Sequence, residues 1–137
     1  MLPSEAQSDG NASENPSPLK AYTVTVPELF PKPRRSGHWG HEYALKKRWA
    51  RDFAYLFRAE GCTRAYDGEH RYVTITRHHK GVAMDKDNLY STGKVPLDAM
   101  CKAGILWDDA PLYCTLTMVD APGAKESSTV ITVEVEA

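Results

Sequence analysis

The sequence predicts an α+β fold of two layers, in which a mixed four-stranded sheet carries two helices on one face. Two observations predict this fold. Four segments alternate apolar and polar residues, which is the period of a half-buried strand, and two segments repeat apolar residues every three to four positions, which is the period of an amphipathic helix. Their order along the chain is β-α-β-α-β-β, and so few helices are expected to pack together against one face.

The first three elements follow a tail. The first predicted strand lies at residues 22–26, where valines alternate with threonines. A helix is predicted over residues 41–60, and Gly61 is expected to end it. The second strand covers residues 71–77.

The second half of the chain supplies one more helix and two strands. The helix is predicted at about residues 94–103, with Pro96 in its first turn, where proline is tolerated, and Gly104 after its last. Strands are predicted at residues 112–118 and 131–135. Because they follow one another directly, we expect them to pair as a hairpin with a long loop.

Composition defines the domain and its environment. Residues 1–19, rich in Ser, Asn, Glu and Pro, are expected to be a disordered tail, and residues 20–137 a single domain. No apolar run approaches the roughly 20 residues that a membrane span needs. The N-terminus lacks the features of a signal peptide, so a cytoplasmic protein without a membrane partner is expected. Three widely spaced cysteines indicate neither a disulfide framework nor a zinc ribbon.

A net charge of -1 conceals a strong asymmetry. Residues 20–80 carry 13 Lys and Arg against six Asp and Glu, a net of +7, whereas residues 81–137 carry four against nine, a net of -5. Such a division suits a protein that binds phosphate with one surface and metal with another. The alternative is that exposed helices carry charge for solubility alone. The residues expected to contact phosphate groups, those of a nucleic-acid backbone if that is the partner, are Arg34, Arg35, Lys46, Lys47, Arg48 and Arg51.

Aromatic and histidine side chains accompany these basic residues. Trp39 and Tyr43 could stack on unpaired bases, and for Trp39 packing onto the domain is an equal alternative. His78 and His79 have no cysteine or carboxylate pattern beside them that indicates a metal site. They are interpreted as phosphate contacts or plain surface residues.

An acidic cluster follows the second predicted strand. Asp85 and Asp87 are two residues apart, so in an extended segment both side chains point to the same side. Hard divalent ions such as Mg²⁺ commonly take one or two carboxylates together with water and substrate phosphate. Taken alone, Asp-x-Asp is more typical of a solvated turn, and the same explanation fits Asp108 and Asp109 alone.

The residues that follow the pair change this interpretation. In order they are Asp85-Lys86-Asp87-Asn88-Leu89, then Lys94, Asp98-Ala99-Met100, Lys102-Ala103-Gly104 and Trp107-Asp108-Asp109. This string resembles the RusA family of Holliday junction resolvases. The resemblance implies a Mg²⁺- or Mn²⁺-dependent crossover junction endodeoxyribonuclease, of bacterial or phage origin, that resolves branched DNA in recombination and repair.

The resemblance also implies roles for single residues. It makes Asp85, Asp87 and Asp109 metal ligands, and Lys94 a catalytic lysine that stabilises charge near the scissile phosphate. Asp98, one helical turn beyond Lys94, is either an orienting partner of that lysine or a member of a surface ion pair.

Two features of the string leave alternatives open. Compared with the shorter family pattern, about three extra residues stand between Leu89 and Lys94. Lys94 keeps its implied place if they bulge outward and loses its role if they do not. Asp108 replaces Asp109 as a ligand if the local backbone turns the other way.

The expected assembly follows from the substrate. A four-way junction needs two symmetric cuts and so small a domain offers one site, so a homodimer is expected. One alternative is a catalytically inactive DNA-binding protein of the same family. Another is a scaffold or regulatory domain whose acidic loop only forms a turn, in which case Mg²⁺ would not stabilise the fold.

Overall fold

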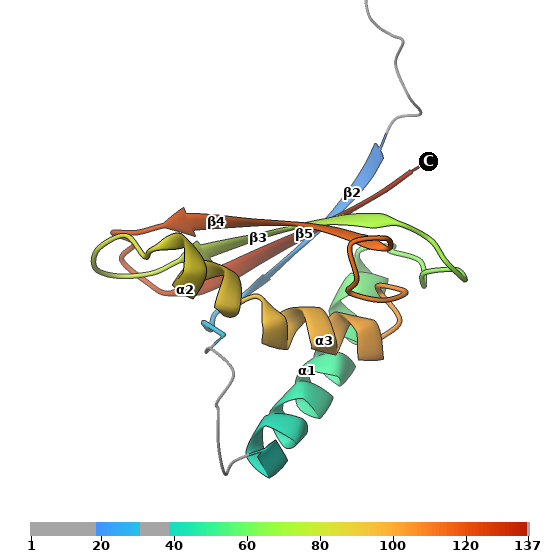
Figure 1. Ribbon diagram of the computed structural model, residues 1–137, viewed down its shortest axis with the longest axis horizontal. Helices are drawn as coiled ribbons and strands as arrows, with labels where there is room; N and C mark the ends of the chain where they lie inside the picture. The colour runs from blue at the N-terminus through green and yellow to red at the C-terminus, as the bar shows by residue number, and fades with distance from the viewer. Residues whose placement is uncertain (1–18, 31–38, 137) are drawn as a thin grey trace, which may run out of the picture.

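The computed structural model describes residues 19–30 and 39–136, with side chains from residue 44 onwards in the second range. These residues form β2 (Leu19–Val26), α1 (Trp39–Ala59), β3 (Arg71–His78), α2 (Lys86–Ser91), α3 (Lys94–Lys102), β4 (Cys114–Ala121) and β5 (Ser128–Glu136). The α+β class and the mixed four-stranded sheet are confirmed, with α1 and α3 beneath one face of the sheet (Figure 1). None of the described helices is long and apolar enough to cross a membrane.

The ends of the elements show where the sequence-based boundaries hold. Leu19 already belongs to β2, and the rest of the predicted tail lies outside the described residues. α3 begins at Lys94 with Pro96 in its first turn, as predicted, and Gly104 has the positive φ of +80° that favours glycine after a helix. A separate short helix, α2, precedes α3, which the sequence did not predict.

The strand order corrects one prediction. The sheet runs β2-β5-β3-β4, so β5 lies between β2 and β3 and is antiparallel to both, whereas β4 is parallel to β3 at the edge. The predicted hairpin of the last two strands is therefore wrong. A parallel β3–β4 pair needs a long crossover, and α2 and α3 provide it.

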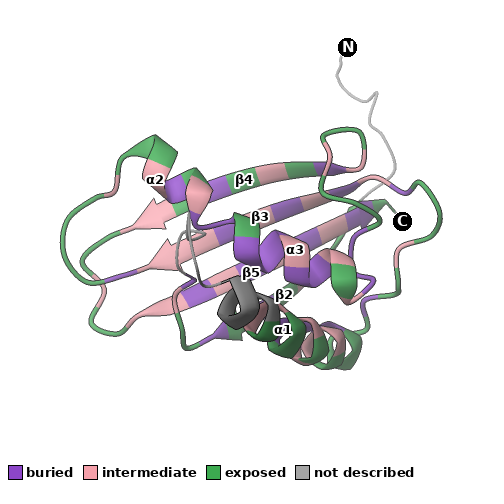
Figure 2. Cartoon of the chain, turned by 60° about the horizontal axis from the view of Figure 1, so that its bottom comes forward, coloured by how far each residue is buried: buried purple, intermediate pink, exposed green. Residues whose placement is uncertain are grey.

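The core lies between the sheet and the two longer helices. Fully buried side chains come from α1 (Phe53, Phe57) and from the inward face of β5 (Ile131, Val133). Figure 2 shows buried residues along α3 and the strands that it faces. Leu112, the first residue of the strand predicted at residues 112–118, is 71% exposed and precedes β4, which begins two residues later.

Gly93 separates α2 from α3 close to the sheet. A Cβ atom at this position would lie 2.9 Å from the sulfur of Met118 on β4 and 3.3 Å from the carbonyl oxygen of Tyr90. A larger residue here would therefore require the Met118 side chain to move and the Tyr90 carbonyl to shift, whereas glycine fits the break without either change.

Candidate active site

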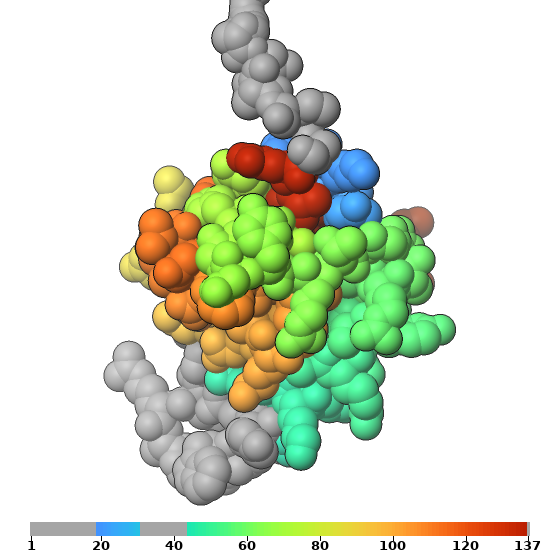
Figure 3. Space-filling view, turned by 90° about the vertical axis from the view of Figure 1, so that its right-hand side faces the viewer, coloured from blue at the N-terminus to red at the C-terminus, as the bar shows by residue number. Residues whose placement is uncertain are grey.

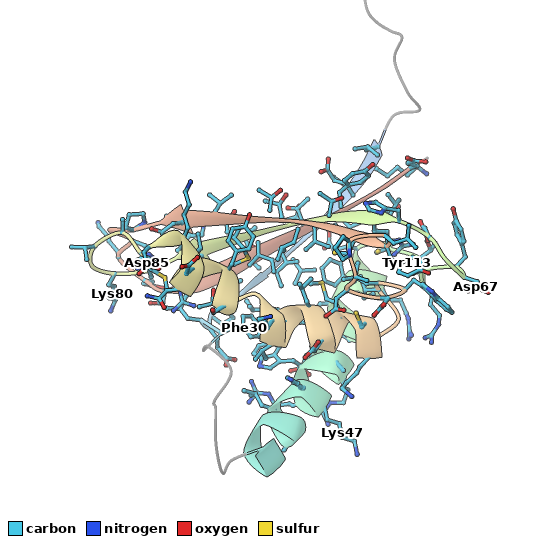
Figure 4. The ribbon with its side chains drawn as sticks, viewed as in Figure 1. Phe30, Lys47, Asp67, Lys80, Asp85 and Tyr113 are labelled. Atoms are coloured by element: carbon cyan, nitrogen blue, oxygen red, sulfur yellow. The ribbon has the colours of Figure 1, made fainter. Side chains whose placement is uncertain are left out.

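The acidic pair lies where the parallel strands end. β3 and β4 run in register from Arg71 opposite Cys114 to His78 opposite Ala121, so their carboxyl ends meet at one edge. The chain leaves β3 through residues 79–84 and enters α2 at Asp85, which Figure 4 shows at that edge together with Lys80. Ligand sites in sheets with parallel strands commonly lie outside the carboxyl ends of the strands.

Asp85 is the N-cap residue of α2. Its backbone is extended, at φ -72° and ψ 161°, and its Oδ1 accepts a hydrogen bond from the backbone N–H of Asn88 at 2.8 Å. Its Oδ2 accepts a second from the Asn88 side-chain amide, also at 2.8 Å. Capping explains why the local sequence folds this way, and it leaves each carboxylate oxygen a further lone pair that can bind a cation.

Asp87 lies inside the helix rather than in an extended segment. α2 begins at Lys86, so the expectation that Asp85 and Asp87 share a side through strand geometry is wrong. The two acids instead occupy the N-cap and the first turn of one helix, and both are exposed. Within the described part of the chain no ion pair neutralises either of them.

A substitution at Asp85 should separate its capping role from its charge. Asp85→Ala is expected to lower the free energy of unfolding by about 1 kcal/mol, because α2 loses its cap, whereas Asp85→Asn should stay within a few tenths, since asparagine caps equally well. Urea unfolding of the three proteins measures this. Equal losses for Ala and Asn would contradict the assignment of the cap.

Lys94 is exposed at the first position of α3. Residues 90–93 before it form the last turn of α2 and the break, with Thr92 and Gly93 buried and the Thr92 hydroxyl donating to the Leu89 carbonyl oxygen at 2.6 Å. The catalytic role implied for Lys94 stays a prediction.

Asp109 lies in the segment between α3 and β4, at the other end of the molecule from Asp85. Burial, and after it the nearby charge of Asp109, raises the pKa of Cys114, the first residue of β4, to about 11. Asp85 instead lies near the end of β4. At about 3.3 Å per residue the eight residues of β4 span roughly 23 Å.

The predicted ligand set is therefore not gathered within one chain. Figure 4 shows Asp85 and Tyr113, the residue before β4, at opposite ends of the sheet. Among the described residues no three His, Cys, Asp or Glu side chains lie close enough together to hold a metal ion. Ligation by Asp85, Asp87 and Asp109 stays a prediction: the first two lie at the start of α2, and Asp109 lies before β4.

Asp109 belongs to a second acidic group. Partial burial, followed by the charges of Asp98 and Asp108, raises its pKa above the ordinary value. The same three carboxylates add to the effect of burial on Cys101, whose pKa is raised to about 12. Asp108 is exposed beside Asp109, and this geometry does not favour one over the other as a ligand.

The raised pKa of Asp109 predicts a gain in stability on its neutralisation. The ionised form is disfavoured in the folded protein, so Asp109→Asn is expected to raise the melting temperature slightly at pH 7. The gain should shrink as the pH falls through the raised pKa towards 3.8, because the wild-type carboxyl is then protonated as well. Thermal melts of the wild-type and variant proteins at pH 7 and near pH 3.8 measure this. An equal gain in melting temperature at both pH values would contradict it.

Asp98 has a partner other than the one first considered. Its carboxylate lies 2.8 Å from the ammonium nitrogen of Lys46, so it joins α3 to α1 in an ion pair. Of the two alternatives for Asp98, the structure favours the ion pair, and Lys94 is not its partner. The same contact occupies Lys46, one of the residues predicted to bind DNA phosphates.

Of the other predicted DNA contacts, Lys47, Arg48 and Arg51 are all exposed on α1. Arg48 lies 3.2 Å from the carboxylate of Glu28 and above the Trp49 ring at 4.8 Å, and Arg51 lies 3.8 Å from the carboxylate of Asp52. Together with Ala44 these three basic residues line a depression of about 300 Å³. The predicted contacts Arg34 and Arg35, and the side chains of Trp39 and Tyr43, lie outside the described residues.

The burial of several polar side chains was not anticipated. His79, expected at the surface, is buried and bound to Asp120. Arg71 is 1% exposed at an inward position of β3, where it follows the same alternation as Val73 and Ile75. That alternation was visible in the sequence and could have revealed the arginine.

Arg71 connects the segment before β3 to the segment after α3. It donates to the carbonyl oxygens of Thr63 at 2.8 Å and of Ile105 at 2.9 Å, and it forms an ion pair with the buried Glu69 at 3.1 Å. The two segments lie side by side on the face shown in Figure 3, where the backbone N–H of Ala65 also donates to the Gly104 carbonyl oxygen. This cluster fixes the end of the sheet near Asp109.

Comparison with known proteins adds no assignment: no protein-family model matches the chain, and no curated protein matches it.

Proposed function

We propose that the protein is a metal-dependent endodeoxyribonuclease that cuts branched DNA, with its divalent cation bound by Asp85 and Asp87 at the start of α2. The observation that carries the proposal is the ordered string over residues 85–109, which resembles the RusA family. A bound Mg²⁺ or Mn²⁺ would generate hydroxide at neutral pH and neutralise charge on the leaving oxygen of the phosphodiester.

The donor atoms at the start of α2 fit such a cation. Mg²⁺ is usually bound by one or two carboxylates, and water and substrate phosphate complete its shell. Asp85 and Asp87 supply two exposed carboxylates within the first turn of one helix. A divalent cation bound there would offset the two negative charges.

Substrate binding would use the helical layer. Lys47 and Arg51 are exposed on α1 and Lys94 on α3, so three cations are available for backbone phosphates. Such contacts bind without reading the base sequence, and affinity is expected to fall steeply with salt. Paired cuts across a four-way junction are supplied by a homodimer.

The proposal is tested by incubating the protein with a labelled four-way junction, a linear duplex and a single strand, each with Mg²⁺, Mn²⁺ or EDTA. We expect symmetric nicks in the junction with either metal and none in EDTA. Equal cutting of all three substrates would leave a nuclease without preference for junctions. The proposal is contradicted if none of the three substrates is cut in the presence of either metal.

A second candidate is a DNA-binding protein of this type that no longer cuts. Two observations favour it: both oxygens of Asp85 accept hydrogen bonds from Asn88, and Asp109 lies at the opposite end of β4. Such a protein would shift the junction in a gel at low salt in the presence of Mg²⁺ yet leave it intact. The same incubations, run on native and denaturing gels, distinguish the two candidates.

A further inference from the structure

A buried histidine and a carboxylate lie between the ends of β3 and β4. His79 follows β3, and its Nε2 lies 2.5 Å from Oδ1 of Asp120, near the end of β4. Its Nδ1 lies 3.0 Å from the carbonyl oxygen of Lys80. The backbone N–H of His79 also donates to the Ala121 carbonyl oxygen at 3.1 Å, so the pair is fixed to the sheet.

The partners of the histidine define its protons. A carboxylate and a carbonyl oxygen accept hydrogen bonds and donate none, so both ring nitrogens of His79 donate when the ring is an imidazolium. The contacts therefore fit a charge-assisted bond between an imidazolium and a carboxylate, which is about twice as strong as a neutral one.

The second oxygen of Asp120 reaches the loop that leads to the acidic pair. Oδ2 accepts a hydrogen bond from the backbone N–H of Met84 at 2.9 Å, and Met84 immediately precedes Asp85. Between His79 and Met84 the loop contains Gly81 at φ +91° and Val82, which is 86% exposed. One carboxylate thus connects the two ends of a loop that is otherwise open to solvent.

We propose that Asp120 is a positioning residue for the candidate metal site: by joining His79 to the Met84 amide, it fixes the loop of residues 79–84 and so the direction of Asp85. This inference rests on the proposed function for its consequence, but not for its geometry. Groups that orient metal ligands commonly change metal affinity 10- to 100-fold when removed.

The charges around Asp120 support this role. The Met84 amide first, and then His79, hold its pKa below the ordinary value, and Arg77 adds a smaller attraction. Arg77 is itself fixed by a 2.8 Å hydrogen bond from its guanidinium to the carbonyl oxygen of Phe30. Asp120 is therefore ionised and fully engaged at neutral pH.

The test compares Asp120→Ala, Asp120→Asn and His79→Ala with the wild-type protein, and uses Thr117→Ala on the same strand as a matched control. Amide hydrogen exchange of Met84 reports the loop, and titration with Mn²⁺ reports the site. Asp120→Ala should speed Met84 exchange at least about tenfold, the loss of one bond to a charged group. It should weaken Mn²⁺ binding by about 10- to 100-fold.

The other variants separate positioning from general stability. Asp120→Asn should keep Met84 protected, because its amide oxygen still accepts the bond while its amide N–H donates to a neutral His79. His79→Ala removes the buried pair but leaves the bond to Met84, so it should weaken Mn²⁺ binding less than Asp120→Ala at a similar loss of melting temperature. Metal affinities that follow melting temperature alone across the series would overturn the positioning role.

The exchange data also keep the inference separate from the proposed function. If the wild-type protein binds no Mn²⁺ and cuts no junction, the proposed function fails and the positioning role fails with it, whereas slow Met84 exchange would still establish the loop contact. If Met84 in the wild-type protein exchanges as fast as Val82, the loop contact itself is absent. This last comparison needs no variant and stands even if Asp120→Ala does not fold.

Discussion

Asp87→Asn is expected to lower the rate of Mg²⁺-dependent junction cleavage by more than about 100-fold, because it removes a charged ligand. Removal of a group that only orients a metal ligand already costs 10- to 100-fold in affinity or activity. The substitution keeps the size of the side chain in the first turn of α2, and its exposed position predicts little change in stability. Initial rates of nicking on a labelled four-way junction measure the effect.

Asp67→Asn is the matched control for this experiment. Asp67 is an exposed aspartate in the turn before β3, at the end of the molecule opposite Asp85 (Figure 4). Its neutralisation changes the net charge by the same amount and should leave the rate unchanged. An Asp87→Asn protein that cuts as fast as this control would remove Asp87 from the site.

Arg71→Met is expected to lower the free energy of unfolding by about 3–5 kcal/mol. The substitution leaves the carboxylate of Glu69 buried without its ion-pair partner, and a buried charge left alone typically costs this much. It also removes the donor to the carbonyl oxygens of Thr63 and Ile105. Urea unfolding monitored by far-UV circular dichroism measures the loss.

Two further variants check the physical reason. Arg51→Met changes an exposed arginine of α1 and should stay within about 0.5 kcal/mol of the wild type. Adding Glu69→Gln to Arg71→Met should recover part of the loss, because the unpaired buried charge is gone. A double variant as unstable as Arg71→Met alone would place the loss in the backbone contacts instead.

The fold class could be predicted because local periodicity records which residues face the core. The valines of β2 and the inward residues of β5 alternate in the sequence as they do in the structure. Strand order could not be predicted in the same way, because the hairpin rule assumes that consecutive strands pair. β5 is buried at every inward position, as a central strand requires, whereas β4 is largely exposed on its outer side, as suits an edge.

The candidate site could be predicted only in its local part. Asp85 and Asp87 lie in one helical turn because they are two residues apart in sequence, but helix geometry does not turn the side chains of residues i and i+2 toward each other. The position of Asp109 depends on the register of β4 against β3, which no local pattern reveals. The Lys46–Asp98 pair likewise joins two helices that are far apart in sequence.

Mn²⁺-induced broadening of backbone amide resonances tests whether the start of α2 holds the catalytic metal. If it does, amides of residues 84–89 broaden first, at Mn²⁺ concentrations that support cleavage, and Asp85→Asn or Asp87→Asn removes the effect. Broadening centred on residues 107–110, or none at those concentrations, would contradict it.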